Sequence, residues 1–321
     1  MKKKIIITCV CAILLAGVGF AGIKAVRELY RLYYQMLGLI EYYGESESRD
    51  ASSIHSLMSD IAILSSAKDR TSPMYQFHYD WVKGNRLIAH AMGVLGEQDY
   101  TNSLEAFHES YEKGYRVFEI DFDLTEKEHA LILSHGDKWA KDRENSYYSF
   151  FHRDVSYTPL DFDMVLDLMM EYPDIYIVTD TKYPNSEEYR LEFNQIVYQA
   201  RRKDFTLLNR IIPQVYNEQM LYDIMNIYPF NSVIYTLYFE SDYTPESVAE
   251  MCKRTGVGFV TMPIDIVSWN PIATWGPENI IVAVHTINKT NLADELFSWG
   301  YTMLYSDSLN PADYESELDS K

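Results

Sequence analysis

Acidic and large apolar residues alternate along FEIDFDL, residues 118–124, so that Glu119, Asp121 and Asp123 fall at every second position. Side chains of a β-strand alternate between its two faces, which would place the three carboxylates about 7 Å apart on one face. If that face meets water, the segment is an ordinary half-exposed antiparallel strand. If the face is buried, the carboxylates need protons or a cation, because an unpaired buried charge is costly. The chemistry of this segment therefore depends on what covers it.

Other residues suited to acid–base or phosphate chemistry stand near the ends of apolar runs. His90 lies at the end of LIAHA, His135 at the end of ALILSH, and Asp180 at the end of IYIVTD. Lys182 follows two residues after Asp180 and would share a strand face with it, which favours contact with phosphate. A lone histidine at the end of a strand usually only packs there. A function for His90 or His135 therefore requires that the fold bring it to the carboxylates.

Nine short apolar segments are expected to be strands, and stretches with helical periodicity separate most of them. The segments comprise residues 87–91, 117–122, 130–135, 175–180, 211–216, 233–237, 258–262, 280–285 and 302–306. The clearest helix lies within NSLEAFHESYEKG, residues 102–114, where Asn102 is expected as the N-cap and Gly114 as the stop. This capping role is a sufficient structural explanation for Asn102.

The pair of segments at 117–122 and 130–135 decides the topology. Only DLTEKEH separates them, which is too short for a crossover between parallel strands. They are therefore expected to form an antiparallel hairpin. Eight parallel strands remain, and eight strand–helix units predict a (β/α)₈ TIM barrel.

A barrel strand has helices on one face and the closed interior on the other, so Glu119 and Asp121 should point inward. Asp123, at the turn, should be solvated or stabilise the hairpin. A hairpin centred near Lys127 would place His135 opposite Glu119, to within about one residue. TIM barrels keep their sites at the carboxyl ends of the strands. That mouth would collect His90, Glu119, Asp121, His135, Asp180 and Lys182.

The motifs along the chain are, in order, HAMG, TNSLEAF, FEIDFDLT, SHG, TDTK, VAVHTIN and YSD. Their order and spacing, over about residues 86–308, resemble the glycerophosphodiester phosphodiesterases of the phosphatidylinositol phospholipase C-like phosphodiesterase superfamily. The resemblance implies a barrel that hydrolyses phosphodiesters with one divalent cation held by Glu119, Asp121 and Asp180. It also implies that His90 and His135 form the acid–base pair. Carboxylate ligands suit a hard cation, Mg²⁺ before Ca²⁺, better than Zn²⁺.

Several positions depart from the family pattern. Ala91 stands where the family has an arginine, Thr101 where it has a metal-binding glutamate, and His285 where it has a tryptophan. Gly136 replaces an aspartate, and Asp180 replaces a glutamate. The site is also similar to that of the sphingomyelinase D branch, which lacks the extra glutamate. Two alternatives therefore stay open: a sphingomyelinase D-like or lysophospholipase D-like enzyme, or a membrane-tethered binding protein on a decayed phosphodiesterase barrel.

The composition limits the partners of the chain. A formal charge of −19 argues against nucleic acid as a partner and against simple electrostatic adhesion to anionic lipid. If the protein handles a small phosphodiester or a lipid headgroup, a cation or a few basic residues must do so locally. Of the three cysteines only Cys252 lies in the expected barrel, so no disulfide framework is possible there.

The N-terminus predicts attachment to a membrane. MKKK precedes nineteen residues without a charge, IIITCVCAILLAGVGFAGI, and a helical pattern continues beyond them. We expect an anchor or signal segment at residues 1–26, a helical stalk at 27–84 and the barrel at 85–321. The absence of a break favours an uncleaved single-pass anchor with the barrel outside the cytoplasm. Cleavage would instead give a secreted protein.

Overall fold

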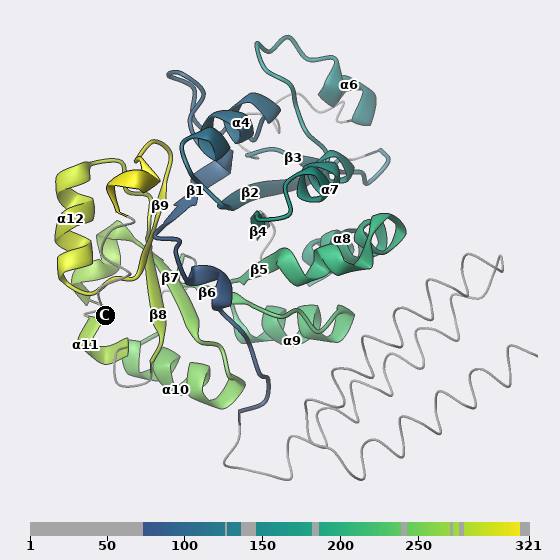
Figure 1. Cartoon of the computed structure of the whole chain (residues 1–321). Helices are drawn as coiled ribbons and strands as arrows, with labels where there is room; N and C mark the ends of the chain where they lie inside the picture. The colour runs from purple at the N-terminus through teal and green to yellow at the C-terminus, as the bar shows by residue number, and fades with distance from the viewer. Residues whose placement is uncertain are drawn as a thin grey trace, which may run out of the picture.

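The computed structural model of the chain describes residues 73–125, 127–135, 146–181, 186–238, 243–269, 272–275 and 279–314 (Figure 1). The expected membrane segment and most of the expected stalk lie outside these residues, and so does Lys182. Among the described helices, none combines the length and the apolar character needed to cross a bilayer. The expected domain boundaries stay predictions.

Eight parallel strands of the described chain form a closed barrel, as the sequence predicts. Each strand pairs with the next in sequence, and the last pairs with the first. The strands are β1 (Leu87–Ala89), β2 (Val117–Leu124), β4 (Tyr176–Thr181), β5 (Ile211–Val215), β6 (Ile234–Thr236), β7 (Phe259–Pro263), β8 (Ile281–His285) and β9 (Met303–Ser306). The expected and observed strand bounds differ by no more than two residues at either end.

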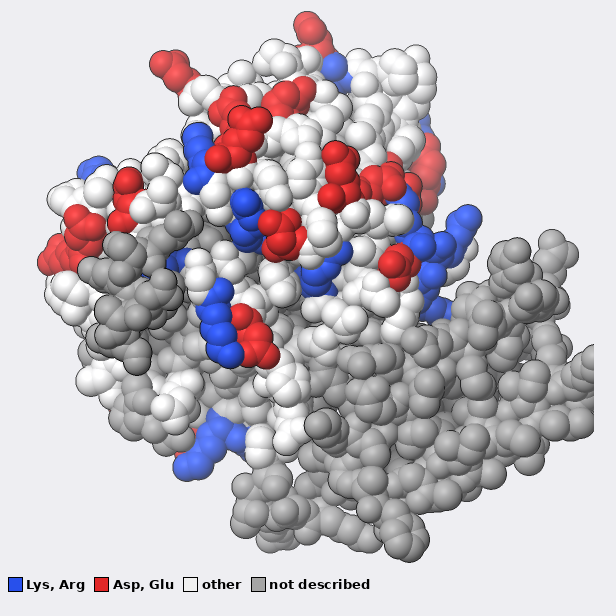
Figure 2. Space-filling view, in the orientation of Figure 1, with Lys and Arg blue, Asp and Glu red and all other residues white. Residues whose placement is uncertain are grey.

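Helices surround the barrel (Figure 1). The α-helices are α4 (Leu104–Glu112), α6 (Tyr147–Phe151), α7 (Phe162–Glu171), α8 (Ser186–Lys203), α9 (Glu218–Ile227), α10 (Pro245–Thr255), α11 (Ile272–Trp275) and α12 (Thr290–Ser298). Short 3-10 turns are η1 (Asp80–Val82), η2 (His90–Met92), η3 (Phe205–Arg210), η4 (Ile264–Trp269) and η6 (Pro311–Asp313). Acidic and basic side chains are interspersed over the face of the molecule in Figure 2.

The predicted hairpin is present, with β3 (Leu131–Leu133) antiparallel to β2 outside the ring of eight. Its register differs by one residue from the expected one, because Leu133 pairs with Phe122 rather than with Asp121. The shift moves His135, two residues beyond β3, away from a position directly opposite Glu119.

The two faces of β2 lie as the alternation predicts. Phe118, Ile120 and Phe122 are fully buried in the core that includes residues of the surrounding helices. Glu119 and Asp121 are 2% and 1% exposed and lie on the other, inward face. Asp123 is also buried, at 5% exposed, and pairs with Ile132 in the hairpin, so of its two expected roles only the solvated one is wrong. One of its carboxylate oxygens accepts a hydrogen bond from the amide of Leu124 at 2.8 Å.

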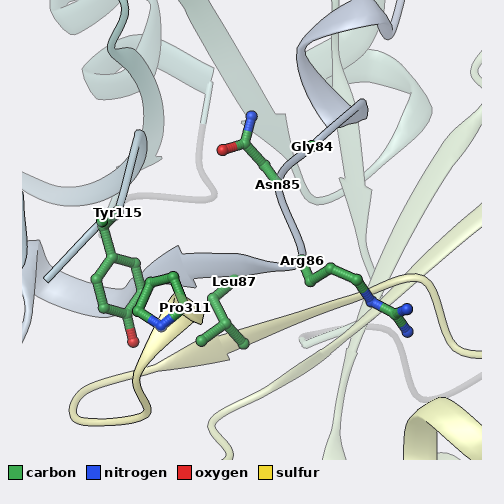
Figure 3. Close-up of a pocket in the computed structure, with 7 residues that line it drawn as sticks. Gly84, Asn85, Arg86, Leu87, Tyr115 and Pro311 are labelled. Atoms are coloured by element: carbon green, nitrogen blue, oxygen red, sulfur yellow. The ribbon is translucent and has the colours of Figure 1, made fainter. Parts of the chain in front are cut away.

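The base of the barrel is closed by the residues that precede β1. Trp81 stacks on Phe259 with their ring centroids 5.4 Å apart, and its indole nitrogen donates to the hydroxyl of Ser232 at 3.1 Å. Below the polar mouth, inward apolar residues fill the interior with Trp81 against them. A small pocket lies at this base, lined by Gly84, Asn85, Arg86, Leu87, Gly114, Tyr115 and Pro311 (Figure 3).

Candidate metal and acid–base site

Three carboxylates meet at the carboxyl ends of β2 and β4. Glu119, Asp121 and Asp180 each offer an oxygen, and these oxygens lie within 4.8 Å of one another. The two strands are parallel neighbours with Asp121 paired directly to Asp180, and Glu119 lies two residues earlier on the same inward face. The structure thus brings together the three residues that the family resemblance implies as ligands.

Hydrogen bonds from the chain orient two of these carboxylates. The backbone amide of Ala91 donates to Oε2 of Glu119 at 2.7 Å. Nδ2 of Asn102 donates to Oδ2 of Asp121 at 2.8 Å, and the amide of Asp121 donates back to Oδ1 of Asn102 at 3.0 Å. Ala91 and Asn102 both have a left-handed backbone, with φ of 47° and 46°. Non-glycine residues rarely adopt this conformation, and here it accompanies hydrogen bonds to two candidate ligands.

The third carboxylate, Asp180, accepts hydrogen bonds at Oδ1 from Gln214 Nε2, at 3.0 Å, and from the hydroxyl of Tyr216. Tyr305 in turn donates to Oε1 of Gln214 at 2.9 Å. Burial raises the pKa of the Tyr216 phenol well above its usual value, and the neighbouring Asp180 carboxylate raises that pKa further. Tyr216 therefore stays protonated and remains a donor to Asp180.

These carboxylates fit a divalent cation. Glu119 and Asp121 are almost fully buried, and three like charges this close oppose one another unless a positive charge lies among them. The donor set consists of carboxylate oxygens, which hard cations prefer. Hydrogen-bond donors of the chain already orient each carboxylate, as is usual for metal ligands. Glu119, Asp121 and Asp180 would hold the ion.

His90 lies in the turn directly after β1 and is paired with an aspartate at the end of the neighbouring strand β9. Nδ1 of His90 donates to Oδ1 of Asp307 at 2.8 Å, and the two side chains are only 14% and 12% exposed. Asn288 donates to the other carboxylate oxygen of Asp307, and the amide of Asp307 donates to Oδ1 of Asn288 at 2.9 Å. The arrangement fixes the imidazole through Nδ1, so that Nε2 is the ring nitrogen not used in this pair.

The pKa values of His90 and Asp307 are both shifted from their usual values. Burial tends to lower the pKa of His90. The hydrogen bond to Asp307 and the negative charges of Glu119, Asp121 and Asp307 outweigh burial and raise this pKa to about 9. Burial conversely tends to raise the pKa of Asp307, but the bond to His90 holds it below its usual value. In the metal-free protein at neutral pH the pair is therefore ionic, and a cation on the carboxylates would lower the pKa of His90.

The second predicted histidine, His135, reaches the same region through an aromatic neighbour. The ring of Tyr100 lies 4.5 Å from the ring of His135 and 5.0 Å from the ring of His90, measured between centroids. Both histidines predicted to act together thus contact one tyrosine at the barrel mouth. His285 lies elsewhere on this mouth, at the end of β8, and its ring contacts those of Tyr238 and Tyr305.

Sequence reasoning missed several residues of this site. Asn102 is not the N-cap of α4: Ser103 is, with its hydroxyl accepting from the amide of Ala106 at 3.3 Å, and Asn102 binds Asp121 instead. Asp307 falls directly after a predicted strand, so its position at the mouth could have been inferred. The other missed residues are Tyr100, Gln214, Tyr216 and Asn288.

Neither a protein-family model nor a curated protein matches the chain significantly. Solved structures do match. A glycerophosphodiester phosphodiesterase from Parabacteroides distasonis is 17% identical, with a TM-score of 0.59 over 74% of this chain and 98% of that one. One from Agrobacterium tumefaciens is 11% identical, with a TM-score of 0.53 over 72% and 99%. This chain has the glycerophosphodiester phosphodiesterase fold. At these identities the likeness confirms the family resemblance at the level of the fold.

A third structure with the glycerophosphodiester phosphodiesterase fold carries a ligand. It is a phosphodiesterase from Oleispira antarctica in complex with the product sn-glycerol 3-phosphate, 16% identical, with a TM-score of 0.57 over 73% of this chain and 97% of that one.

Proposed function

We propose that the protein is a divalent-cation-dependent phosphoric diester hydrolase that cleaves a small glycerophosphodiester or a phospholipid-type headgroup. One observation carries the proposal: an oriented triad of carboxylates lies beside the buried His90–Asp307 pair at the mouth of a barrel with the glycerophosphodiester phosphodiesterase fold. The product bound to the phosphodiesterase from Oleispira antarctica supports a small phosphodiester as the substrate class.

Cleavage of a phosphodiester requires a nucleophile, a proton for the leaving oxygen and neutralisation of the phosphoryl charge. A bound cation, Mg²⁺ by preference and Ca²⁺ as the alternative, would supply the charge neutralisation. His90, with Nδ1 held by Asp307, presents Nε2 as the general acid that protonates the leaving alkoxide. His135 takes the proton of the nucleophile, which is water for direct hydrolysis or a substrate hydroxyl for cyclisation. Lys182, two residues beyond Asp180, contacts the phosphate in this proposal.

A second candidate, a sphingomyelinase D-like or lysophospholipase D-like enzyme, is favoured by Thr101. This residue stands where the family resemblance implies a fourth acidic ligand, and its hydroxyl lies 2.9 Å from that of Ser103. Thr101 is buried and offers no carboxylate. A site with three carboxylates resembles that branch, whose substrates carry a lipid chain.

The substrate test separates these candidates from a binding protein. The full-length protein is incubated with Mg²⁺ and either glycerophosphocholine or lysophosphatidylcholine, and the products are identified. Release of glycerol 3-phosphate and choline from the first supports the proposal, and preferential cleavage of the second supports the alternative. If neither compound is cleaved, and a sphingolipid tested in the same way is not cleaved either, the result favours the membrane-tethered binding protein over both enzymes. Full activity after exhaustive chelation contradicts the metal-dependent mechanism.

The proposed location is the cell membrane, with the barrel outside the cytoplasm. Its support is the uncharged run of nineteen residues after MKKK. Protease added to intact cells should then digest the barrel. Protection of the barrel would reverse the orientation, and recovery of the protein from the soluble fraction would indicate cleavage or no anchor.

A further inference from the structure

Tyr100 contacts both histidines of the proposed acid–base pair. Its ring meets the imidazole of His90 edge to face, with an interplanar angle of 82° and centroids 5.0 Å apart. It meets the imidazole of His135 at 48°, with centroids 4.5 Å apart. One aromatic ring is thus in contact with both groups that would move protons.

The chain holds Tyr100 there through an unusual loop. Tyr100 and Asn102 both have a left-handed backbone, with φ of 55° and 46°. Two hydrogen bonds join Asn102 to Asp121, one of the proposed metal ligands. Beyond it the hydroxyl of Ser103 caps helix α4. The position of Tyr100 is therefore tied to the metal ligands on one side and to a helix on the other.

The surroundings of Tyr100 exclude a role as the general base. Partial burial raises the pKa of its phenol, and the charges of Asp307, Asp99, Asp121 and Glu119 raise it further. The phenol is therefore protonated throughout the neutral range and cannot accept a proton from the nucleophile. The two contacts with histidines are made by the ring, and the ring therefore carries the inference.

Spacing matters for phosphoryl transfer because the nucleophile and the leaving oxygen lie roughly in line on opposite sides of phosphorus. A base and an acid must then act from two separate places. Without a group between them, two neighbouring imidazoles can pack or hydrogen-bond together, and their protonation then becomes coupled. A rigid aromatic ring that packs against both imidazoles, as Tyr100 does, is suited to prevent this approach.

We propose that Tyr100 is a positioning residue whose ring holds His90 and His135 apart, so that one imidazole faces the nucleophile and the other the leaving oxygen. This inference rests on the proposed phosphodiesterase function. It assigns a role to the residue next to Thr101, where the family pattern has its additional acidic ligand.

The kinetic test compares Tyr100→Ala with Tyr100→Phe in the full-length protein with Mg²⁺, using bis(p-nitrophenyl) phosphate and glycerophosphocholine. Tyr100→Phe keeps the ring and should stay within about threefold of the wild-type kcat. Tyr100→Ala should lower kcat by about thirtyfold or more, with KM within about threefold, because only the alignment of proton transfer is lost. The matched control is Tyr198→Ala, a half-exposed tyrosine on α8, which should not change kcat.

Three outcomes would overturn the role of the ring. A wild-type kcat for Tyr100→Ala shows that the spacing is not needed. An equal loss in Tyr100→Phe shows that the hydroxyl rather than the ring acts. A loss of Mg²⁺ affinity by calorimetry that parallels the loss of kcat in Tyr100→Ala shows that Tyr100 only supports the metal site.

A measurement without turnover keeps the inference distinct from the proposed function. In metal-free protein with selectively labelled histidines, nuclear Overhauser contacts should link each imidazole to Tyr100 but not to the other imidazole. In Tyr100→Ala, direct contacts between the imidazoles of His90 and His135 should appear. If the imidazoles keep their wild-type separation, the spacing role is wrong. If instead the wild type cleaves no phosphodiester, the proposed function fails while this result still decides the spacing.

Discussion

The base and the mouth of the barrel interior are built by the same strands but have opposite chemistry. On β2 the inward residue near the base is Val117, and the next inward residue is Glu119. On β5 the corresponding change is from Ile212 to Gln214. Two residues along a strand thus separate an apolar layer from a polar one.

The difference lies in what holds each layer together. At the base, rings and aliphatic side chains fill the space and Trp81 covers it, so apolar burial is the main source of stability in this layer. At the mouth, carboxylates are fixed by directional hydrogen bonds from Ala91, Asn102 and Gln214. Burial tolerates many residues of suitable size, whereas the mouth requires particular atoms in particular places. Substitutions at the mouth should therefore change activity far more than stability, and those at the base should do the reverse.

The largest effect on activity is expected from a proposed metal ligand. Glu119→Gln removes one charge from the triad, although its amide oxygen can still accept the hydrogen bond from Ala91. Phosphodiester hydrolysis should fall by about a thousandfold, since several kcal/mol of charge stabilisation are lost. Calorimetry should show greatly weakened Mg²⁺ binding. Asp80→Asn, in an exposed pair with Lys83, is the control and should leave the rate of hydrolysis and the affinity for Mg²⁺ unchanged.

Glu119→Gln should also change how the Tm responds to Mg²⁺. Mg²⁺ should raise the Tm of the wild type, because a ligand that binds only the folded state stabilises it, and stripping the ion should lower it again. Mg²⁺ should leave the Tm of Glu119→Gln almost unchanged. The metal-free variant should be more stable than the metal-free wild type, because repulsion within the triad is relieved. A wild-type Tm that does not respond to Mg²⁺ or Ca²⁺ would contradict the metal site.

The next effect concerns the two histidines. His90→Ala and His135→Ala should each lower turnover by about a hundredfold or more, because each removes one group of the proposed acid–base pair. The double variant should lose little beyond either single one, since an acid and a base that act in one step are not additive. Both single variants should fold and bind Mg²⁺ normally, because neither histidine is a proposed ligand. Near-normal rates in both would show that the acid–base assignment is wrong.

A smaller effect is expected from Asp307→Asn, which leaves His90 in place but weakens its orientation. Turnover should fall by about ten- to a hundredfold, as for other partners that orient an active group. Nuclear magnetic resonance titration of the metal-free variant should give a His90 pKa clearly below the wild-type value of about 9.

The free energy of unfolding of the metal-free protein should also depend on the His90–Asp307 pair. Because the pKa of His90 is raised from 6.5 to about 9, its bond to Asp307 contributes fully below pH 6.5 and is lost as the pH rises through about 9. The difference in unfolding free energy between wild type and Asp307→Asn should therefore shrink across that window. A difference that is constant from pH 6 to 10 would show that the pair is not ionic.

The fold was predictable because its signals are local and periodic. Alternation along β2 separates the buried phenylalanines from the acidic residues, and the short DLTEKEH segment forces a hairpin. The carboxylates and His90 were predictable because strand ends meet at the mouth. Asn102 was not, since a residue before a helix has a capping role in sequence, whereas only the closed barrel brings it to Asp121. The contact of Tyr100 with both histidines likewise depends on a left-handed backbone and on a hairpin register that sequence fixes only to about one residue.

The smallest effect on activity is expected at the base. Trp81 is 5% exposed, stacks on Phe259 and donates to Ser232, so Trp81→Ala removes a large ring from a closed layer. The free energy of unfolding should fall by about 3–5 kcal/mol, as is usual when a buried tryptophan becomes alanine. At temperatures where the variant is folded, kcat should equal that of the wild type, because the carboxylates and histidines lie at the other end of the strands. Trp299→Ala, which removes a half-exposed tryptophan, is the matched control and should change stability by no more than about 0.5 kcal/mol. Denaturant unfolding measures the free energy of unfolding, and assays at low temperature measure kcat. A fall in kcat for folded Trp81→Ala would show that the base helps to position the mouth, and the two ends would then act as one unit.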